Sequence, residues 1–202
     1  MNLLEEKNLP AILLIAVLVV AVWSVISVED TYLTWALESI PVWIALPLLG
    51  LTYKKYRLPG IIYAVLALHM TVLLVGAHYS YANVPLGYWM QDWFGFTRNN
   101  YDKIGHFMQG VTPAILTSHI LVRSTPLKKG GWVAFLSLSV AMMVSATYEI
   151  IEWLVSLSNP EDTEAFLGTQ GYIWDTQTDM FMCLLGAVFA LTFLKLANKR
   201  NG

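Results

Sequence analysis

Six long apolar stretches dominate the chain and leave it little choice of fold. They cover about residues 10–28, 34–53, 60–81, 104–122, 130–157 and 176–197. Each approaches the ~20 residues that an α-helix needs to cross a bilayer. Inside lipid every backbone polar group must be bonded within the protein, which leaves helices and closed barrels as spanning structures. The sequence predicts an all-α fold, a polytopic membrane helix bundle of six transmembrane helices in a single domain over residues 1–202.

The composition agrees with lipid as the main partner. Only 13% of the residues are charged, about half the share in a soluble domain. The net charge of −2 gives no basic footprint for nucleic acid. A single cysteine, Cys183, excludes an internal disulfide and a Cys-rich metal cage, and its apolar surroundings favour a small buried side chain. The oligomeric state cannot be read from these features.

Two of the stretches allow another interpretation. The first resembles a signal peptide, but it is long for one and lacks a clear cleavage site before Glu29. The second is interrupted by Glu38, Pro41 and Pro47. We interpret both as retained helices, since dropping the second would scatter the basic residues over both faces of the membrane.

The basic residues predict the orientation. In a six-span arrangement ten of the twelve fall on one side, and only Arg98 and Lys103 fall on the other. Cytoplasmic loops are the ones enriched in Lys and Arg, so both termini are expected in the cytoplasm (N-in/C-in). Most acids sort to the outer side, partly in a segment, residues 161–164, that is expected to be a solvated turn.

Ionisable residues enter three of the helices at their outer ends. The segments are RNNYDKIGHFMQ (98–109), TYEIIEW (147–153) and GTQGYIWDTQTDM (168–180). At 1.5 Å per residue, His106, Glu152 and Asp179 are expected at one level, roughly 6 Å below the outer entrance. Such groups are costly in a membrane unless paired, hydrated or metal-bound, so we expect them to converge in an outward-facing cavity. The acids and imidazole that pair along one helix face are Asp102 with His106, Glu149 with Glu152, and Asp175 with Asp179.

Structural roles for the same residues stay open. Asp102 and Asp175 can cap helix starts and complement the helix dipole. The two glutamates can form ion pairs with Arg98 or Lys103 that hold helices together.

The chemistry of the set suits a divalent metal. Carboxylates with an imidazole bind Zn, Mn or Mg, and such a metal activates water against an ester or phosphoester; His78 offers a second imidazole. Without a metal, the same groups act as a general acid–base pair or a proton relay. No HExxH, GxSxG or P-loop pattern decides between these chemistries, and no other cofactor is indicated.

The three motifs together resemble the YjdF-like bacterial inner-membrane proteins, over most of the chain. A weaker similarity, confined to the last three helices, links the chain to VanZ-like membrane proteins. The resemblance implies a multi-pass protein of the bacterial inner membrane, but neither family supplies a reaction. The positions that match the YjdF-like signature are Arg98, Asp102, His106, Gln109, Glu149, Glu152, Trp174, Asp175, Gln177 and Asp179.

The leading functional prediction is an outward-facing His/carboxylate site that acts on a lipid-linked or envelope substrate, with metal-dependent hydrolysis as the candidate reaction. The alternatives are a small proton-coupled transporter and a non-catalytic structural or accessory protein. The expected catalytic residues are His106, Glu149, Glu152 and Asp179. The expected metal ligands are His106, Asp102, Glu152, Asp175 and Asp179. The expected substrate-binding residues are Arg98, Lys103, Gln109, Trp174 and Gln177.

Overall fold

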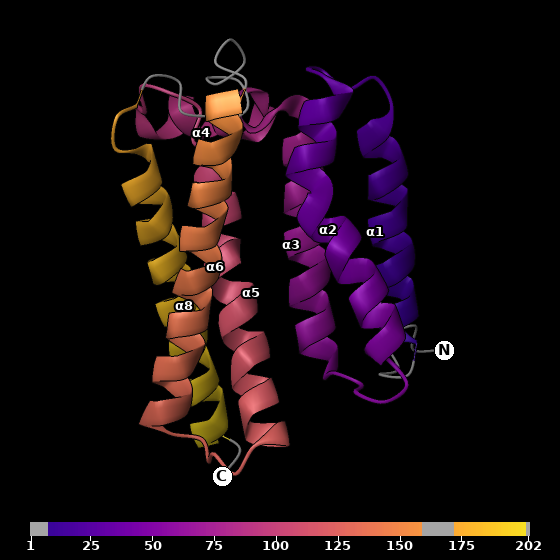
Figure 1. Ribbon diagram of the computed structural model, residues 1–202, viewed down its shortest axis with the longest axis vertical. Helices are drawn as coiled ribbons and strands as arrows, with labels where there is room; N and C mark the ends of the chain where they lie inside the picture. The colour runs from indigo at the N-terminus through magenta and orange to yellow at the C-terminus, as the bar shows by residue number, and fades with distance from the viewer. Residues whose placement is uncertain (1–7, 159–171, 201–202) are drawn as a thin grey trace. The chain divides into compact units, whose positions relative to one another are not determined.

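The computed structural model of the protein describes residues 8–158 and 172–200 and, for residues 158 and 197–200, the backbone alone. Within these ranges there are seven α-helices, one short 3-10 helix and no strand (Figure 1). The all-α prediction is confirmed, and the segment 161–164 lies outside the described residues. The helices are α1 (Leu9–Val25), α2 (Tyr32–Thr52), α3 (Gly60–Tyr79), η1 (Tyr81–Asn83), α4 (Pro85–Phe94), α5 (Tyr101–Ser124), α6 (Gly131–Ser158) and α8 (Asp175–Arg200).

Four of the described helices, α2, α3, α6 and α8, are long and apolar enough to cross a membrane. Helix α1 is also apolar but has 17 residues, at the lower limit for a span. Helix α5 has 24 residues but is not apolar enough to qualify, since charged and other polar side chains fill its first half. The count of six spans and the N-in/C-in orientation therefore stay predictions.

The prolines that interrupt the second apolar stretch do not end its helix. Pro41 and Pro47 both lie inside α2, which runs without a break for 21 residues. Each proline removes one backbone hydrogen bond, a loss that membrane helices tolerate when neighbouring groups re-satisfy the carbonyls. Thr31 caps the start of the helix, and its side chain accepts a hydrogen bond from the Thr34 backbone N–H (3.1 Å).

The chain divides into two compact units, Met1–Tyr101 and Asp102–Gly202; the expected single domain stays a prediction. In the first unit α3 packs against both α1 and α2. The buried residues of α3 recur every fourth position, at Ile62, Leu66, Met70 and Leu74, which places them on one face of the helix. The first unit is thus a helix bundle centred on α3.

Polar contacts also link the helices of the first unit. The Trp35 indole donates a hydrogen bond to the Ser24 hydroxyl (3.2 Å), which joins α2 to α1. The His78 Nδ1 lies 3.2 Å from the Ser24 carbonyl oxygen, and the His78 ring centroid lies 4.3 Å from that of Trp23. His78, expected from the sequence as a possible second imidazole for the site, therefore contributes to the packing of α3 on α1.

Helix α4 has the features of a helix that lies at a membrane interface. It begins at Pro85 and ends before Gly95, which adopts the left-handed conformation (φ 67°) that favours glycine. Trp89, Trp93 and Phe94 are all exposed. Exposed aromatic side chains on a short amphipathic helix are typical of residues that rest at the headgroup level.

Small residues hold the second unit together. A Cβ atom at Gly110 of α5 would collide with the Cys183 carbonyl oxygen of α8, and one at Gly186 of α8 would collide with the Phe107 carbonyl oxygen of α5. The Cys183 thiol donates a hydrogen bond to the Ala141 carbonyl oxygen of α6 (3.5 Å). Cys183 is buried, as predicted for a small side chain in an apolar stretch. Backbones this close require glycine, alanine or serine at the contact.

We predict that Gly110→Ala destabilises the protein by about 1–3 kcal/mol, the usual cost of overpacking a close contact. Gly131→Ala is the matched control, because within the described part of the chain nothing lies within 4 Å of a Cβ atom at that position. Thermal unfolding in detergent measures both variants. If Gly110→Ala unfolds at the temperature of the wild type, the two backbones are not in contact.

Candidate functional site

The polar residues of the second unit lie on the same helix faces as the small residues at which its helices pack together. Residues four apart in a helix lie one above another on the same face. The positions that share a face in this way are 102, 106 and 110 on α5, 175, 179 and 183 on α8, and 141, 145 and 149 on α6. Gly110, Cys183 and Ala141 form the close contacts between these helices. The acids, the histidine and Ser145 lie one or two helical turns away from these contacts on the same faces. The buried ionisable members are Asp102, His106, Glu149, Asp175 and Asp179.

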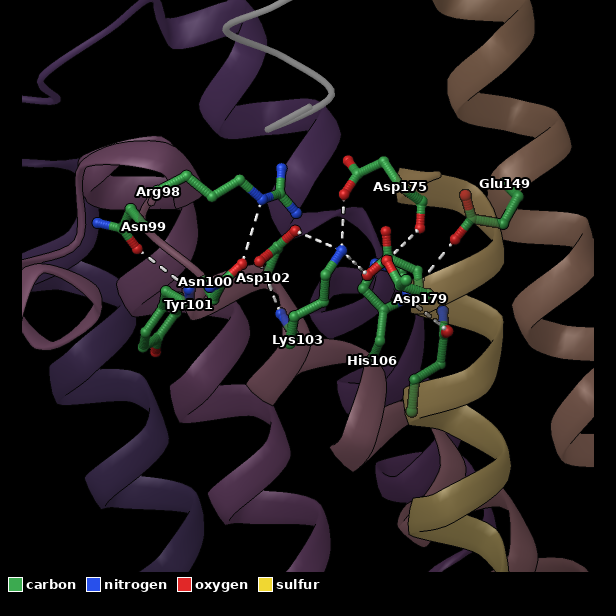
Figure 2. Close-up of polar contacts among 12 residues, drawn as sticks. Arg98, Asn99, Asn100, Tyr101, Asp102, Lys103, His106, Glu149, Asp175 and Asp179 are labelled. Carbon is green, nitrogen blue, oxygen red and sulfur yellow. Dashed lines mark hydrogen bonds and ion pairs between the residues drawn. The ribbon is translucent and has the colours of Figure 1, made fainter. Parts of the chain in front are cut away.

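A lysine is the centre of the cluster (Figure 2). The Lys103 Nζ lies 2.6 Å from Asp175 Oδ1, 2.7 Å from Asp179 Oδ1 and 3.1 Å from Asp102 Oδ2. The Lys103 side chain is 13% exposed. Three short contacts use all three protons of an ammonium group, so Lys103 joins α5 to α8 by ion pairs with the aspartates, and not by the pair with a glutamate that the sequence left open.

His106 lies between two carboxylates. Its Nδ1 is 3.2 Å from Gln109 Oε1 and 3.6 Å from Glu149 Oε1, and its Nε2 is 3.6 Å from Asp179 Oδ1. Because the amide oxygen of Gln109 can only accept, we assign the proton to Nδ1. In the neutral ring Nε2 then carries the lone pair, on the side of Asp179.

Glu149 is the least satisfied member of the cluster. It is 7% exposed, and its Oε1 has no hydrogen-bond partner among the described residues. A buried carboxylate oxygen without a partner is costly, and this one faces His106. The arrangement leaves a position beside His106 where a cation or a proton would be stabilised.

The geometry defines two groups of metal-binding type among the described residues. One joins His106, Glu149 and Asp179, and the other joins Asp102, Asp175 and Asp179; in each, one candidate ligand atom per residue lies within 4.8 Å of the others. The Lys103 ammonium already fills the second group. In the first group Lys103 contacts Asp179, whereas Glu149 Oε1 has no hydrogen-bond partner among the described residues, so this group is the better candidate for a metal or a proton.

Charge balance leads to the same position. Two buried carboxylates, those of Glu149 and Asp179, face the His106 ring, and the Lys103 ammonium that contacts Asp179 is shared with Asp175. Ionised together, they would leave a negative excess in a poorly hydrated environment, which is unfavourable. Additional positive charge, as a bound cation or as protons, lowers this cost.

Other predicted residues stand outside the first group. Glu152, expected at the level of His106, is half-buried and belongs to neither metal-type group. Trp174 and Gln177 are exposed at the start of α8. Arg98 belongs to the first unit, where its Nε donates to Asn100 Oδ1 (3.1 Å); its role in substrate binding stays a prediction.

The capping role of Asp102 is present beside its role in the cluster. Its Oδ1 accepts a hydrogen bond from the Lys103 backbone N–H (2.8 Å), in the first turn of α5. Asn99, which no sequence motif singled out, accepts from the Tyr101 backbone N–H (3.1 Å) and donates to the Val84 carbonyl oxygen (2.9 Å). It fixes the chain where α5 begins.

A fifth buried acid lies outside the residues predicted from the sequence. Glu38 of α2 is 3% exposed, and neither of its carboxylate oxygens has a hydrogen-bond partner among the described residues. The available signal was a charged residue inside an apolar stretch, which is rare in membrane helices and commonly functional. In the sequence Glu38 stands out only as an interruption of the span.

These features define the protein as a multi-pass α-helical integral membrane protein with a buried cluster of charges. A family model described as "Predicted membrane protein (DUF2238)" matches residues 9–200. The chain is also 45% identical over 175 residues to the inner membrane protein YjdF of Escherichia coli (strain K12), a match that covers 87% of this chain and 83% of that protein. The chain belongs to the DUF2238 family of predicted membrane proteins, and its location is the bacterial inner membrane.

The family match confirms the YjdF-like resemblance, whereas the weaker similarity to VanZ-like proteins stays a prediction. No solved structure matches the chain.

We predict that Lys103→Met lowers the free energy of unfolding by about 3–5 kcal/mol, the cost of removing one partner from a buried ion pair. Adding Asp175→Asn and Asp179→Asn should restore much of the loss, since fewer uncompensated charges then remain. Lys128→Met, which changes an exposed lysine, is the control and should be nearly neutral. Unfolding midpoints measured in detergent test this prediction. Equal effects of the two lysine variants would contradict the ion-pair account.

Proposed function

We propose that the chain crosses the inner membrane six times, with both termini in the cytoplasm, and that its second unit binds a divalent cation for hydrolysis of a lipid or envelope substrate. The topology is supported by the ten basic residues that share one side. Helix α5 completes the count, because its polar groups are paired within the second unit and need not face lipid.

Cysteine labelling tests the topology. The native Cys183 is fully buried, so it adds little background. Thr97→Cys should react with a membrane-impermeant maleimide in spheroplasts, whereas Thr125→Cys should react only after the membrane is permeabilised. Both positions are exposed. The reverse pattern, or labelling of both from outside, would contradict the N-in/C-in arrangement.

The observation that carries the cation site is the convergence of His106, Glu149 and Asp179. Ligands about 2.0–2.2 Å from a tetrahedral zinc ion stand roughly 3.4 Å apart, and His106 Nε2 lies 3.6 Å from Asp179 Oδ1. The contact of Nδ1 with Gln109 corresponds to the outer hydrogen bond that orients most metal-binding histidines. Three protein ligands leave one position open for water, which is the arrangement of catalytic zinc sites.

The proposed roles follow from this geometry. A cation held by His106, Glu149 and Asp179 would lower the pKa of a bound water and polarise an ester or phosphoester. Glu152, three residues after Glu149 and half-buried, is the proposed general base. Trp174 and Gln177, exposed at the start of α8, are proposed to contact the substrate. Lys103 holds Asp179 in place.

A proton relay is the second candidate, and one observation favours it. His106 offers one ring nitrogen to Glu149 and the other to Asp179, both at 3.6 Å. An imidazole between two carboxyl groups can pass a proton from one to the other by exchanging its tautomers. The same cluster would then carry protons for a coupled transporter.

Metal analysis of the purified protein separates the two candidates. The hydrolase proposal expects about one equivalent of zinc, manganese or magnesium, which His106→Ala and Glu149→Gln should remove. Glu152→Gln should keep the metal but lose hydrolysis, because it changes the proposed base and not a ligand. The relay proposal predicts that no metal is bound. It also predicts pH-dependent flux in proteoliposomes, which Glu149→Gln should abolish. If the protein shows neither bound metal nor proton flux, the cluster is a structural ion-pair network.

A further inference from the structure

An apolar groove runs along the first unit. Its volume is about 330 Å³, and its walls come from residues 10–17 of α1, residues 46–53 at the end of α2 and residues 63–70 of α3. Among the described residues that line it, only Tyr53 and Tyr63 have polar side chains. Each wall extends over eight residues, roughly 10 Å along a helix.

A basic loop stands at one end of this groove. It joins α2 to α3 and presents three exposed basic side chains, Lys54, Lys55 and Arg57. The walls of the groove hold the loop in place. The Arg57 guanidinium lies over the Tyr53 ring, 5.7 Å from its centroid, and the Leu58 backbone N–H donates to the Tyr63 hydroxyl (3.2 Å).

We propose that the groove binds an anionic phospholipid, with one acyl chain between α1, α2 and α3 and the phosphate beside Lys54 and Lys55. The two chemical parts of such a lipid match the two parts of the site. The apolar walls accept hydrocarbon, and the positive loop at the groove's end attracts the headgroup phosphate.

The dimensions favour an acyl chain over a protein segment. A helix with its side chains is ≈ 10–12 Å across, and a groove of about 330 Å³ is too small to receive one. Helices α2 and α3 are candidate membrane spans, so lipid is the apolar molecule at hand. The site lies entirely in the first unit and does not depend on the proposed function of the second.

Lipid titration of the full-length protein, followed by native mass spectrometry, tests the proposal. Phosphatidylglycerol and phosphatidylcholine with identical oleoyl chains serve as the two probes. We expect phosphatidylglycerol to bind more tightly to the wild type. Lys54→Gln with Lys55→Gln should weaken its binding about 30-fold, about fivefold for each lysine near a lipid phosphate, and should remove the preference between headgroups.

A matched pair of lysines controls for charge alone. Lys128 and Lys129 are exposed in the loop between α5 and α6, and neither lines the groove. Lys128→Gln with Lys129→Gln should leave phosphatidylglycerol binding within about twofold of the wild type. An equal loss in both double variants would overturn the proposal, because the attraction would then be that of any basic loop.

Gly50→Leu tests the groove itself. Gly50 lines it, and no atom of the described residues lies within 4 Å of a Cβ atom there, so a leucine fills space without a clash at Cβ. It also improves helix propensity, which protects the fold. Phosphatidylglycerol binding should fall at least tenfold with an unchanged unfolding temperature. Unchanged binding would overturn the proposal, as would equal binding of the two lipids by the wild type.

Discussion

The close approach of α5 and α8 is the contact on which the second unit depends. Gly110 and Gly186 each leave no room for a side chain against a carbonyl oxygen of the opposite helix. Once the backbones touch there, residues one and two turns away along the same faces are brought within reach of one another. The ion pairs of Lys103 with Asp175 and Asp179 and the contact of His106 with Asp179 all follow from that spacing.

The cluster contains one cation position that the protein fills itself and one that it does not. Lys103 occupies the position among three aspartates, and Asp179 is shared with the position beside His106 and Glu149. A tethered ammonium holds Asp179 in place while leaving an excess of carboxylates nearby. This arrangement is compatible with both a hydrolase and a proton relay, because a metal ion and a mobile proton each relieve the same excess.

Much of the fold and part of the site could be predicted from the sequence. The apolar stretches predicted helices at all six places, including α2 with its internal Pro41 and Pro47. The level of the polar residues was estimated from helical rise, which put Glu152 at the level of His106 and Glu149 about one turn deeper. The structure places the Glu149 carboxylate beside His106. Rise alone gives depth and not direction, and the direction of a side chain depends on which face of α6 packs against α8.

The sequence by itself determined that the protein lies in lipid and that it is helical. Its long apolar segments can satisfy their backbone groups in lipid only as helices, and its ionisable residues can remain there only if they are paired or bound. Tertiary structure decided which groups meet. Lys103 pairs with aspartates of a helix more than seventy positions away in the chain, because close packing at small residues fixes the distance and rotation of the helices, and no local pattern specifies that contact.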